Sequence, residues 1–177
     1  MNLPNKLTTL RILLVPVFIL LYLMNGNGWI SAAIFIVASF TDYLDGHLAR
    51  KMNLVTNYGK IMDPLADKLL VTSALVCMVQ TSLVPAWMVI VILAREFAIT
   101  GLRAVAASEG IVIAAAWSGK VKTVTQMLAI VFLLIGNWPF EYLHLPFDRI
   151  MLWIAVIMTI YSGVEYIWKS RELFKDM

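Results

Sequence analysis

Two pairs of aspartates interrupt a sequence that is otherwise strongly apolar. Asp42 and Asp45 are three residues apart, and Asp63 and Asp67 are four apart, so each pair can share one face of a helix. If the two faces meet, they form a pocket of four carboxylates. Such oxygen ligands, without histidine or cysteine, suit Mg²⁺, Mn²⁺ or Ca²⁺ rather than zinc. Because Mg²⁺ completes its shell with water and substrate phosphate, the pattern predicts phosphate chemistry.

The residues around the aspartates fit the same chemistry. Gly46 and Gly59 flank the two pairs and would let a bulky ligand approach the backbone closely. Arg50 follows Asp42 by eight residues, about two helical turns, and can present its guanidinium to a phosphate oxygen. The alternative is that the aspartates only form ion pairs with neighbouring basic residues and hold helices together. The number of carboxylates in one short stretch favours ligand binding.

The elements that must position these residues are apolar helices. The chain has 177 residues, of which 61% are hydrophobic and 14% charged, and this composition predicts an integral membrane protein. A spanning helix takes about 20 residues, so the length is used up by one all-α bundle, a single domain over residues 1–177. The six predicted transmembrane helices cover residues 7–24, 29–50, 60–80, 86–106, 119–136 and 148–169.

The distribution of basic residues predicts the orientation of this bundle. Arg149 is the clear basic residue of one side, and the others gather on the opposite side, which we expect to be cytoplasmic. The N- and C-termini and the acidic pocket would then face the cytoplasm from the plasma membrane. Aromatic residues are expected at the outer boundary: Trp29, Trp87, Trp138 and Tyr142. Nothing in the charge pattern indicates nucleic-acid binding.

The complete acidic pattern resembles a known signature. It reads Asp42-x2-Asp45-Gly46-x2-Ala49-Arg50-x8-Gly59-x3-Asp63-x3-Asp67, and it is similar in full to the signature of the CDP-alcohol phosphotransferase family of membrane enzymes. Members transfer a phosphoalcohol group from a CDP-linked donor to an acceptor hydroxyl and release CMP. Their fold is a six-helix bundle, usually a homodimer, with a polar cavity open to the cytoplasm.

This resemblance implies a role for each matched residue. The four aspartates would hold two divalent ions, Mg²⁺ or Mn²⁺, and Asp67 would also be the general base. The CDP donor would contact Gly46, Arg50 and Gly59. By the same analogy Asn5 and Thr8 would reach the nucleotide, with helix capping as their alternative role.

Outside the signature, the chain resembles the branch of the family that makes phosphatidylglycerophosphate. The similar segments are NLPNKLTTLR at 2–11, DPLADK at 63–68, AREFAITGLR at 94–103 and SGKVKT at 118–123. This implies transfer of the phosphatidyl group of CDP-diacylglycerol to glycerol 3-phosphate. An acceptor that carries a phosphate needs cations, and the candidates are Arg95, Arg103, Lys120 and Lys122. For the lysines, the alternative is an ordinary role in membrane topology.

Two expectations concern acidic residues on the later helices. Arg95 and Glu96 are adjacent and point to different faces of a helix, which predicts separate partners for them. Glu165 is expected to be paired within the bundle. The last helix otherwise looks generic.

Three rival functions remain open at this point. The first is a cardiolipin or phosphatidylinositol-phosphate synthase of the same family, which shares the signature. The second is a membrane prenyltransferase, whose Asp-rich motifs have a different spacing. The third is an ion-coupled transporter or channel that uses the aspartates as cation sites, although both acidic pairs lie near one face of the membrane.

Overall fold

The protein forms six long helices. The computed structural model describes residues 3–25, 28–51, 57–108, 110–111, 113–114 and 116–171, apart from the side chains of residues 3–4, 25, 42–51, 57–58, 60–61 and 64. The helices are α1 (Leu3–Asn25), α2 (Gly28–Lys51), α3 (Asn57–Gln80), α4 (Ala86–Ser108), α5 (Trp117–Leu134) and α6 (Phe147–Lys169). A short 3₁₀ helix, η1 (Phe140–Leu143), precedes α6, and the described residues contain no strand. The all-α prediction of six helices is confirmed, and each predicted end differs by at most four residues.

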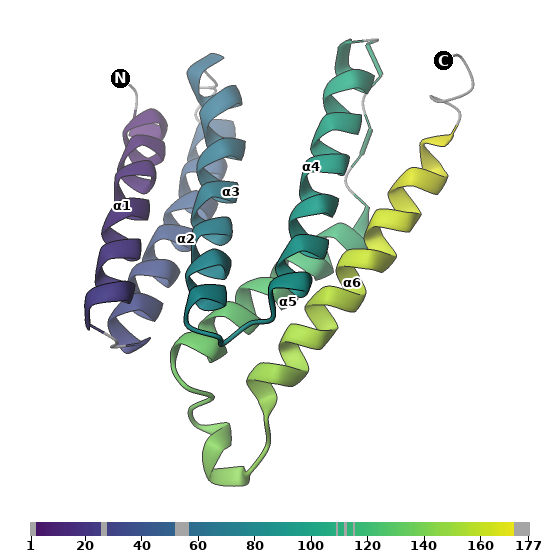
Figure 1. Ribbon diagram of the computed structural model, residues 1–177. Coiled ribbons are helices and arrows are strands. Elements are labelled where there is room, and N and C mark those ends of the chain that lie inside the picture. Colours follow the sequence, from purple (N-terminus) through teal and green to yellow (C-terminus); the bar gives the residue numbers. More distant parts are fainter. Residues whose placement is uncertain are drawn as a thin grey trace.

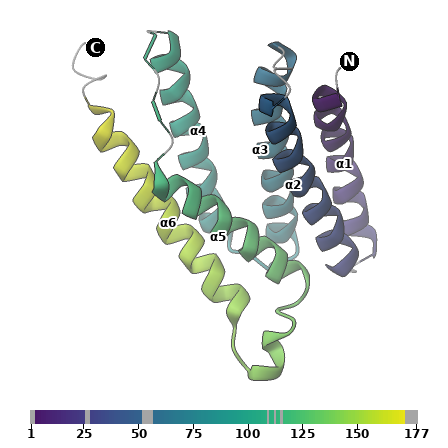
Figure 2. The same ribbon diagram turned by 180° about the vertical axis from the view of Figure 1, so that it is seen from behind.

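Successive helices run in alternating directions. In Figure 1 the start of α1, the end of α2, the start of α3 and the ends of α4 and α6 lie toward the top, whereas the end of α1, the start of α2, the end of α3 and the starts of α4 and α6 lie toward the bottom. Helices α1, α2 and α3 form one group, whereas α4 and α5 both pack against α6. Seen from behind in Figure 2, α5 runs obliquely from α6 toward α2 and so joins the two groups. The end of α2 and the start of α3 therefore share one end of the bundle, and α5 begins farther from that end (Figure 1).

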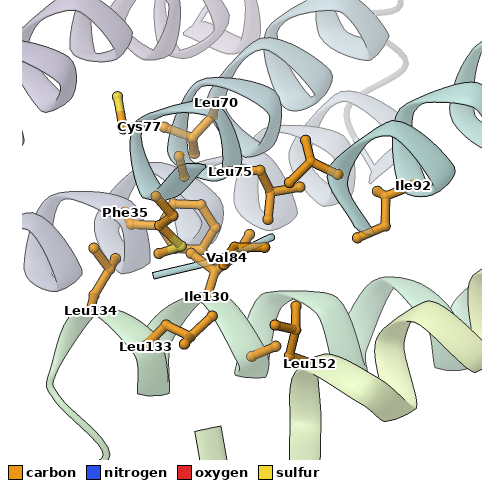
Figure 3. Close-up of a cluster of buried hydrophobic side chains, with 14 of the residues drawn as sticks. Phe35, Leu70, Leu75, Cys77, Val84, Ile92, Ile130, Leu133, Leu134 and Leu152 are labelled. Carbon is orange, nitrogen blue, oxygen red and sulfur yellow. The ribbon is translucent and has the colours of Figure 1, made fainter. Parts of the chain in front are cut away.

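The core lies where these two groups meet. Phe35 of α2, Leu75 of α3, Ile92 of α4 and Ile130 of α5 are almost completely buried and converge in one cluster (Figure 3). Cys77 is also buried as a free thiol, in line with a packing role. In lipid, helices associate through close packing rather than the hydrophobic effect, and small residues permit close approach. Buried alanines line the helix contacts accordingly: Ala32, Ala38, Ala66, Ala74, Ala129 and Ala155.

The outer surface is unusually apolar. Large hydrophobic side chains are exposed on every long helix, for example Leu13 of α1, Phe40 of α2, Ile90 of α4 and Ile157 of α6. A soluble monomer rarely exposes apolar area on this scale. Among the described helices, α1 from Asn5 to Met24 and α6 from Phe147 to Lys169 are long and apolar enough to cross a membrane. This is the surface of a membrane protein.

Gly28 begins α2 at the point where the chain passes closest to α5. A Cβ atom built there would lie 1.7 Å from the backbone oxygen of Leu134, so any side chain must push the two helices apart. Gly28→Ala is expected to cost about 2 kcal/mol of folding free energy. We expect the midpoint of thermal unfolding in detergent to fall by roughly 4–8 °C.

A matched control for this substitution lies on α4. A Cβ at Gly101 would meet no atom within 4 Å, so Gly101→Ala should leave the midpoint unchanged or slightly raised. Equal melting temperatures for the two variants would show that the contact between α2 and α5 tolerates a side chain.

Candidate active site

The backbone brings the two acidic pairs to one end of the bundle. Helices α2 and α3 are consecutive, antiparallel and in contact. Asp45 lies six residues before the end of α2 and Asp63 six residues after the start of α3, about 9 Å along each axis. Asp42 and Asp67 lie nine and ten residues from those ends, about 14–15 Å along the axes. The helix register therefore places the four positions at two matching levels.

The side chains at this site are described only in part. Those of Asp42, Asp45, Gly46 and Arg50 lie outside the described residues, so their predicted contacts stay predictions. Among the side chains that the structure does describe, no three carboxylate, histidine or cysteine groups gather in one place. The described half of the acidic site consists of Asp63 and Asp67.

Asp63 is held by the first helix. Its Oδ1 atom accepts a hydrogen bond of 2.5 Å from the hydroxyl of Thr8, which is fully buried on α1. Asn5 lies one turn earlier on α1 and is also buried, and Gly59 is buried near the start of α3. The structure thus brings Thr8, one of the two N-terminal residues singled out in the sequence, into contact with the acidic site.

Arg11 lies in the interior of the bundle and not at the boundary of the membrane. Basic residues near the N-terminus indicated only membrane topology, but Arg11 is fully buried and its Nε donates to the carbonyl oxygen of Ala38 on α2 at 3.3 Å. Its spacing from Thr8, three residues on one helix, was the available signal that both face the bundle interior.

A cationic cleft adjoins the acidic site. It has a volume of about 420 Å³ and lies between α4, α5 and α6, with one wall residue from α3. Three of the four predicted phosphate-binding residues line it, namely Arg95, Arg103 and Lys120. The fourth cation of the cleft is Lys68, whose ammonium donates to the hydroxyl of Thr100. Several donors for an anion therefore meet in one cleft.

Lys122 lies deeper than the other predicted cations. It is 3% exposed and forms an ion pair with Glu96. The same Glu96 oxygen, Oε1, also accepts a hydrogen bond from Nη1 of Arg95 at 3.0 Å. The expectation of separate partners for Arg95 and Glu96 is therefore wrong. Both side chains are long enough to reach each other, and Glu96 Oε1 contacts Arg95 and the buried ammonium of Lys122 at the same time.

A second pocket connects this ion pair with Asp67. It is lined by Asp67, Glu96, Lys122 and Gln126, and it shares Lys68, Glu96 and Thr123 with the cationic cleft. The two cavities thus adjoin.

Three side chains of the site were not assigned from the sequence. Lys68 was considered only as an ion-pair partner, and Gln126 is 4% exposed and lines the pocket beside Asp67. Tyr166 belongs to the helix that looked generic, yet its ring lines the cleft. The signal in α6 was the polar set Ser162, Glu165 and Tyr166, which has the spacing of one helix face. Glu165 is paired as predicted, with the Ser118 hydroxyl and Lys169.

Comparisons with known proteins identify the family of this chain. The model of the CDP-alcohol phosphatidyltransferase family matches residues 1–161. A Bacillus subtilis protein named CDP-diacylglycerol–glycerol-3-phosphate 3-phosphatidyltransferase is 50% identical, over 98% of this chain and 97% of its own length. Proteins of the same name from Rickettsia felis and Haemophilus influenzae are 39% and 38% identical, over 98% and 99% of this chain and 97% and 96% of their own lengths. The chain belongs to the CDP-alcohol phosphatidyltransferase family.

Proposed function

We propose that the protein is an enzyme that transfers the phosphatidyl group of CDP-diacylglycerol to glycerol 3-phosphate. The products are phosphatidylglycerophosphate and CMP, so the enzyme acts in phospholipid synthesis. The observation that carries the proposal is the cationic cleft that adjoins Asp67, because it offers a phosphate site next to a carboxylate base. Relatives that align over nearly the whole chain are named for the same reaction.

We further propose that Asp42, Asp45, Asp63 and Asp67 hold two divalent ions, Mg²⁺ or Mn²⁺. The donors would be carboxylate oxygens, which these ions prefer, and the four residues lie at similar sequence distances from the end of α2 and the start of α3, which supports the proposal. The hydrogen bond from Thr8 orients one of the carboxylates. When bound, the ions would neutralise the diphosphate of the donor and the leaving phosphate of CMP.

Separate groups of residues bind the CDP donor and the acceptor. Gly46, Arg50 and Gly59 contact the CDP moiety, and Asn5 and Thr8 approach it from α1. The cations of the cleft that bind the acceptor phosphate are Arg95, Arg103 and Lys120. Lys122 acts through Glu96, the carboxylate that it shares with Arg95. This binding directs the hydroxyl of the acceptor toward Asp67.

The reaction then proceeds by direct transfer. Asp67 takes the proton of the acceptor hydroxyl as its oxygen attacks the phosphorus of the phosphatidyl group. The bond between that phosphorus and the CMP oxygen breaks, and CMP leaves with the bonding electron pair. No covalent enzyme intermediate is required.

We also propose that all six helices span the plasma membrane, with both termini and the site on the cytoplasmic side, in a homodimer. Helices α2 to α5 carry the acidic and cationic residues of the proposed site, and these residues lower the hydropathy of the four helices. At the other end Arg149 donates to the Leu83 carbonyl oxygen at 2.5 Å, and Trp29 packs edge-on against Trp138 at 5.3 Å between ring centroids. The homodimer rests on the family resemblance.

The acceptor specificity provides the test of this function. Purified protein in detergent with CDP-diacylglycerol and Mg²⁺ should release CMP when glycerol 3-phosphate is added, and chelation of the metal should stop the release. Phosphatidylglycerol or inositol phosphate should support less than about a hundredth of that rate, because a diacyl lipid or an inositol ring is bulkier than the glycerol that the cleft must direct toward Asp67. Faster release with either of these acceptors would favour the rival synthases of the same family.

Thr8 offers a separate test of the acidic site. Thr8→Val keeps the shape of the side chain but removes the hydrogen bond to Asp63. A hydrogen bond to a charged group contributes about 1.5 kcal/mol or more, so kcat/KM for CMP release should fall about ten-fold. In the control Thr125→Val, the lost hydroxyl bonds only to the carbonyls of its own helix, and activity should stay within about two-fold. Equal rates for the two variants would show that Thr8 does not orient Asp63.

A further inference from the structure

Tyr166 connects the last helix to the two arginines of the cationic cleft. Its side chain is 5% exposed and lies beyond residues 1–161, the part of the chain that the family model matches. The Cζ atoms of Arg95 and Arg103 each lie 5.8 Å from the centroid of its ring. This is within the distance at which a guanidinium is attracted to an aromatic face.

The contact brings together two cations that are far apart along their own helix. Arg95 and Arg103 are eight residues apart, about 12 Å along the axis of α4. Like charges repel, so a group that attracts both guanidinium groups lowers the free energy of placing them beside the same ring. The ring of Tyr166 supplies that attraction at the wall of the cleft.

The ring is itself fixed at its polar end. The hydroxyl of Tyr166 donates to the carbonyl oxygen of Ala114 at 3.0 Å, and Nη2 of Arg103 donates to the neighbouring carbonyl of Ile113 at 3.2 Å. Both carbonyls belong to the connection between α4 and α5. Tyr166 and Arg103 therefore bind neighbouring residues of this connection.

Two glycines leave the space that Arg95 occupies. A Cβ at Gly163 of α6 would lie 3.2 Å from Cγ of Arg95, and a Cβ at Gly119 of α5 would lie 3.4 Å from its Nη2. Nη1 of Arg95 forms the ion pair with Glu96, whereas the buried Nε of Arg95 has no hydrogen-bond partner in the described part of the chain. The direction of the guanidinium thus depends on packing against α5, α6 and Tyr166.

We propose that Tyr166 is a positioning residue for the acceptor phosphate, acting through Arg95 and Arg103. The inference rests on the proposed function, because it takes the cleft to be the site of that phosphate. Tyr166 holds both guanidinium groups toward the cleft before the acceptor arrives, so that binding does not have to order two long side chains. Its contribution belongs to acceptor binding and not to binding of the CDP donor.

The test compares two substitutions of Tyr166 in the purified full-length protein. Tyr166→Leu removes the ring, and we expect KM for glycerol 3-phosphate to rise about ten-fold, equivalent to about 1.4 kcal/mol. The KM for CDP-diacylglycerol and kcat at saturating glycerol 3-phosphate should stay within about three-fold. Tyr166→Phe keeps the ring and should restore KM for the acceptor to within about three-fold of the unsubstituted protein.

The matched control is Tyr161→Leu. Tyr161 lies on the same helix but is 59% exposed, so its removal should change none of these constants. An unchanged KM for glycerol 3-phosphate in Tyr166→Leu would overturn the inference. Equal increases in both KM values together with a similar decrease in kcat would also overturn it, because that pattern indicates general structural damage.

A second variant covers the case in which Tyr166→Leu does not fold. Gly163→Ala places a methyl group against Cγ of Arg95 and leaves Tyr166 intact. It should raise KM for glycerol 3-phosphate about five-fold, with the KM for the donor unchanged, and the absence of that rise would contradict the positioning of Arg95.

The acceptor used by the unsubstituted protein distinguishes failure of the proposed function from failure of the role of Tyr166. If it releases CMP only with a different acceptor, the proposed function fails. If it uses glycerol 3-phosphate and the variants do too with equal KM, only the role of Tyr166 fails.

Discussion

Asp67→Asn is expected to lower kcat for CMP release by about 10³-fold with both substrates saturating. An amide cannot take a proton from the attacking hydroxyl, and general base catalysis contributes about 10²–10⁴-fold. The substitution also removes one carboxylate from the proposed metal site. Because Asp67 lines a pocket and is only partly buried, folding should be preserved, which a thermal unfolding scan in detergent would check.

The control for Asp67→Asn is the same change at the other end of the bundle. Asp148 lies in the first turn of α6 beside Arg149, far along that helix from the cleft. Asp148→Asn should keep kcat within about two-fold, as expected for a surface change. Retention of a tenth or more of the activity in Asp67→Asn would rule out this carboxylate as the general base.

Arg95→Ala is expected to raise KM for glycerol 3-phosphate about 100-fold, which corresponds to about 2.7 kcal/mol. The reason is the loss of charge-assisted hydrogen bonds to the acceptor phosphate, each worth about 1.5–3 kcal/mol. The carboxylate of Glu96 would keep its ion pair with Lys122, so no buried charge is left unpaired. Steady-state kinetics with each substrate varied in turn would show the KM for CDP-diacylglycerol to be nearly unchanged.

A lysine at the same position separates charge from geometry. Arg95→Lys retains the positive charge but not the planar fork, so it should recover only part of the lost affinity. Arg149→Ala, at the opposite end of the bundle, is the control and should affect neither KM. Equal increases in both KM values for Arg95→Ala would contradict a role confined to the acceptor.

The sequence was sufficient to predict the helices, because their signal is local. Long apolar stretches separated by Gly, Pro and Asn predicted all six. The predicted start of α1, residue 7, is later than the observed start at Leu3, because Asn2, Asn5 and Lys6 lower the local hydropathy. In the structure Asn5 is buried on the inner face of α1 near the acidic site, which a hydropathy average cannot distinguish from an exposed position.

The site was predictable only where the pattern lay within one helix or one signature. Arg95, Arg103 and Lys120 were chosen for their charge, and they do line one cleft. The pairing of Arg95 with Glu96 was missed, because it depends on Lys122 of another helix.

The role of Tyr166 could not be predicted for the same reason. Its contact with Arg95 and Arg103 arises from the packing of α4 against α6, and spacing along the chain carries no information about which helices are neighbours. A single tyrosine in an apolar helix has many ordinary roles at a membrane boundary. Only the three-dimensional arrangement shows that its ring faces two cations.

The most direct test of the central claim follows the acceptor into the product. Purified protein would be incubated with CDP-diacylglycerol, Mg²⁺ and radiolabelled glycerol 3-phosphate, and the label in the lipid phase would be compared with the CMP released. The account predicts one labelled phosphatidylglycerophosphate for each CMP, with the rate of formation of both products lowered about 10³-fold in Asp67→Asn. CMP release without label in lipid, or cation flux through reconstituted vesicles without CMP release, would contradict it.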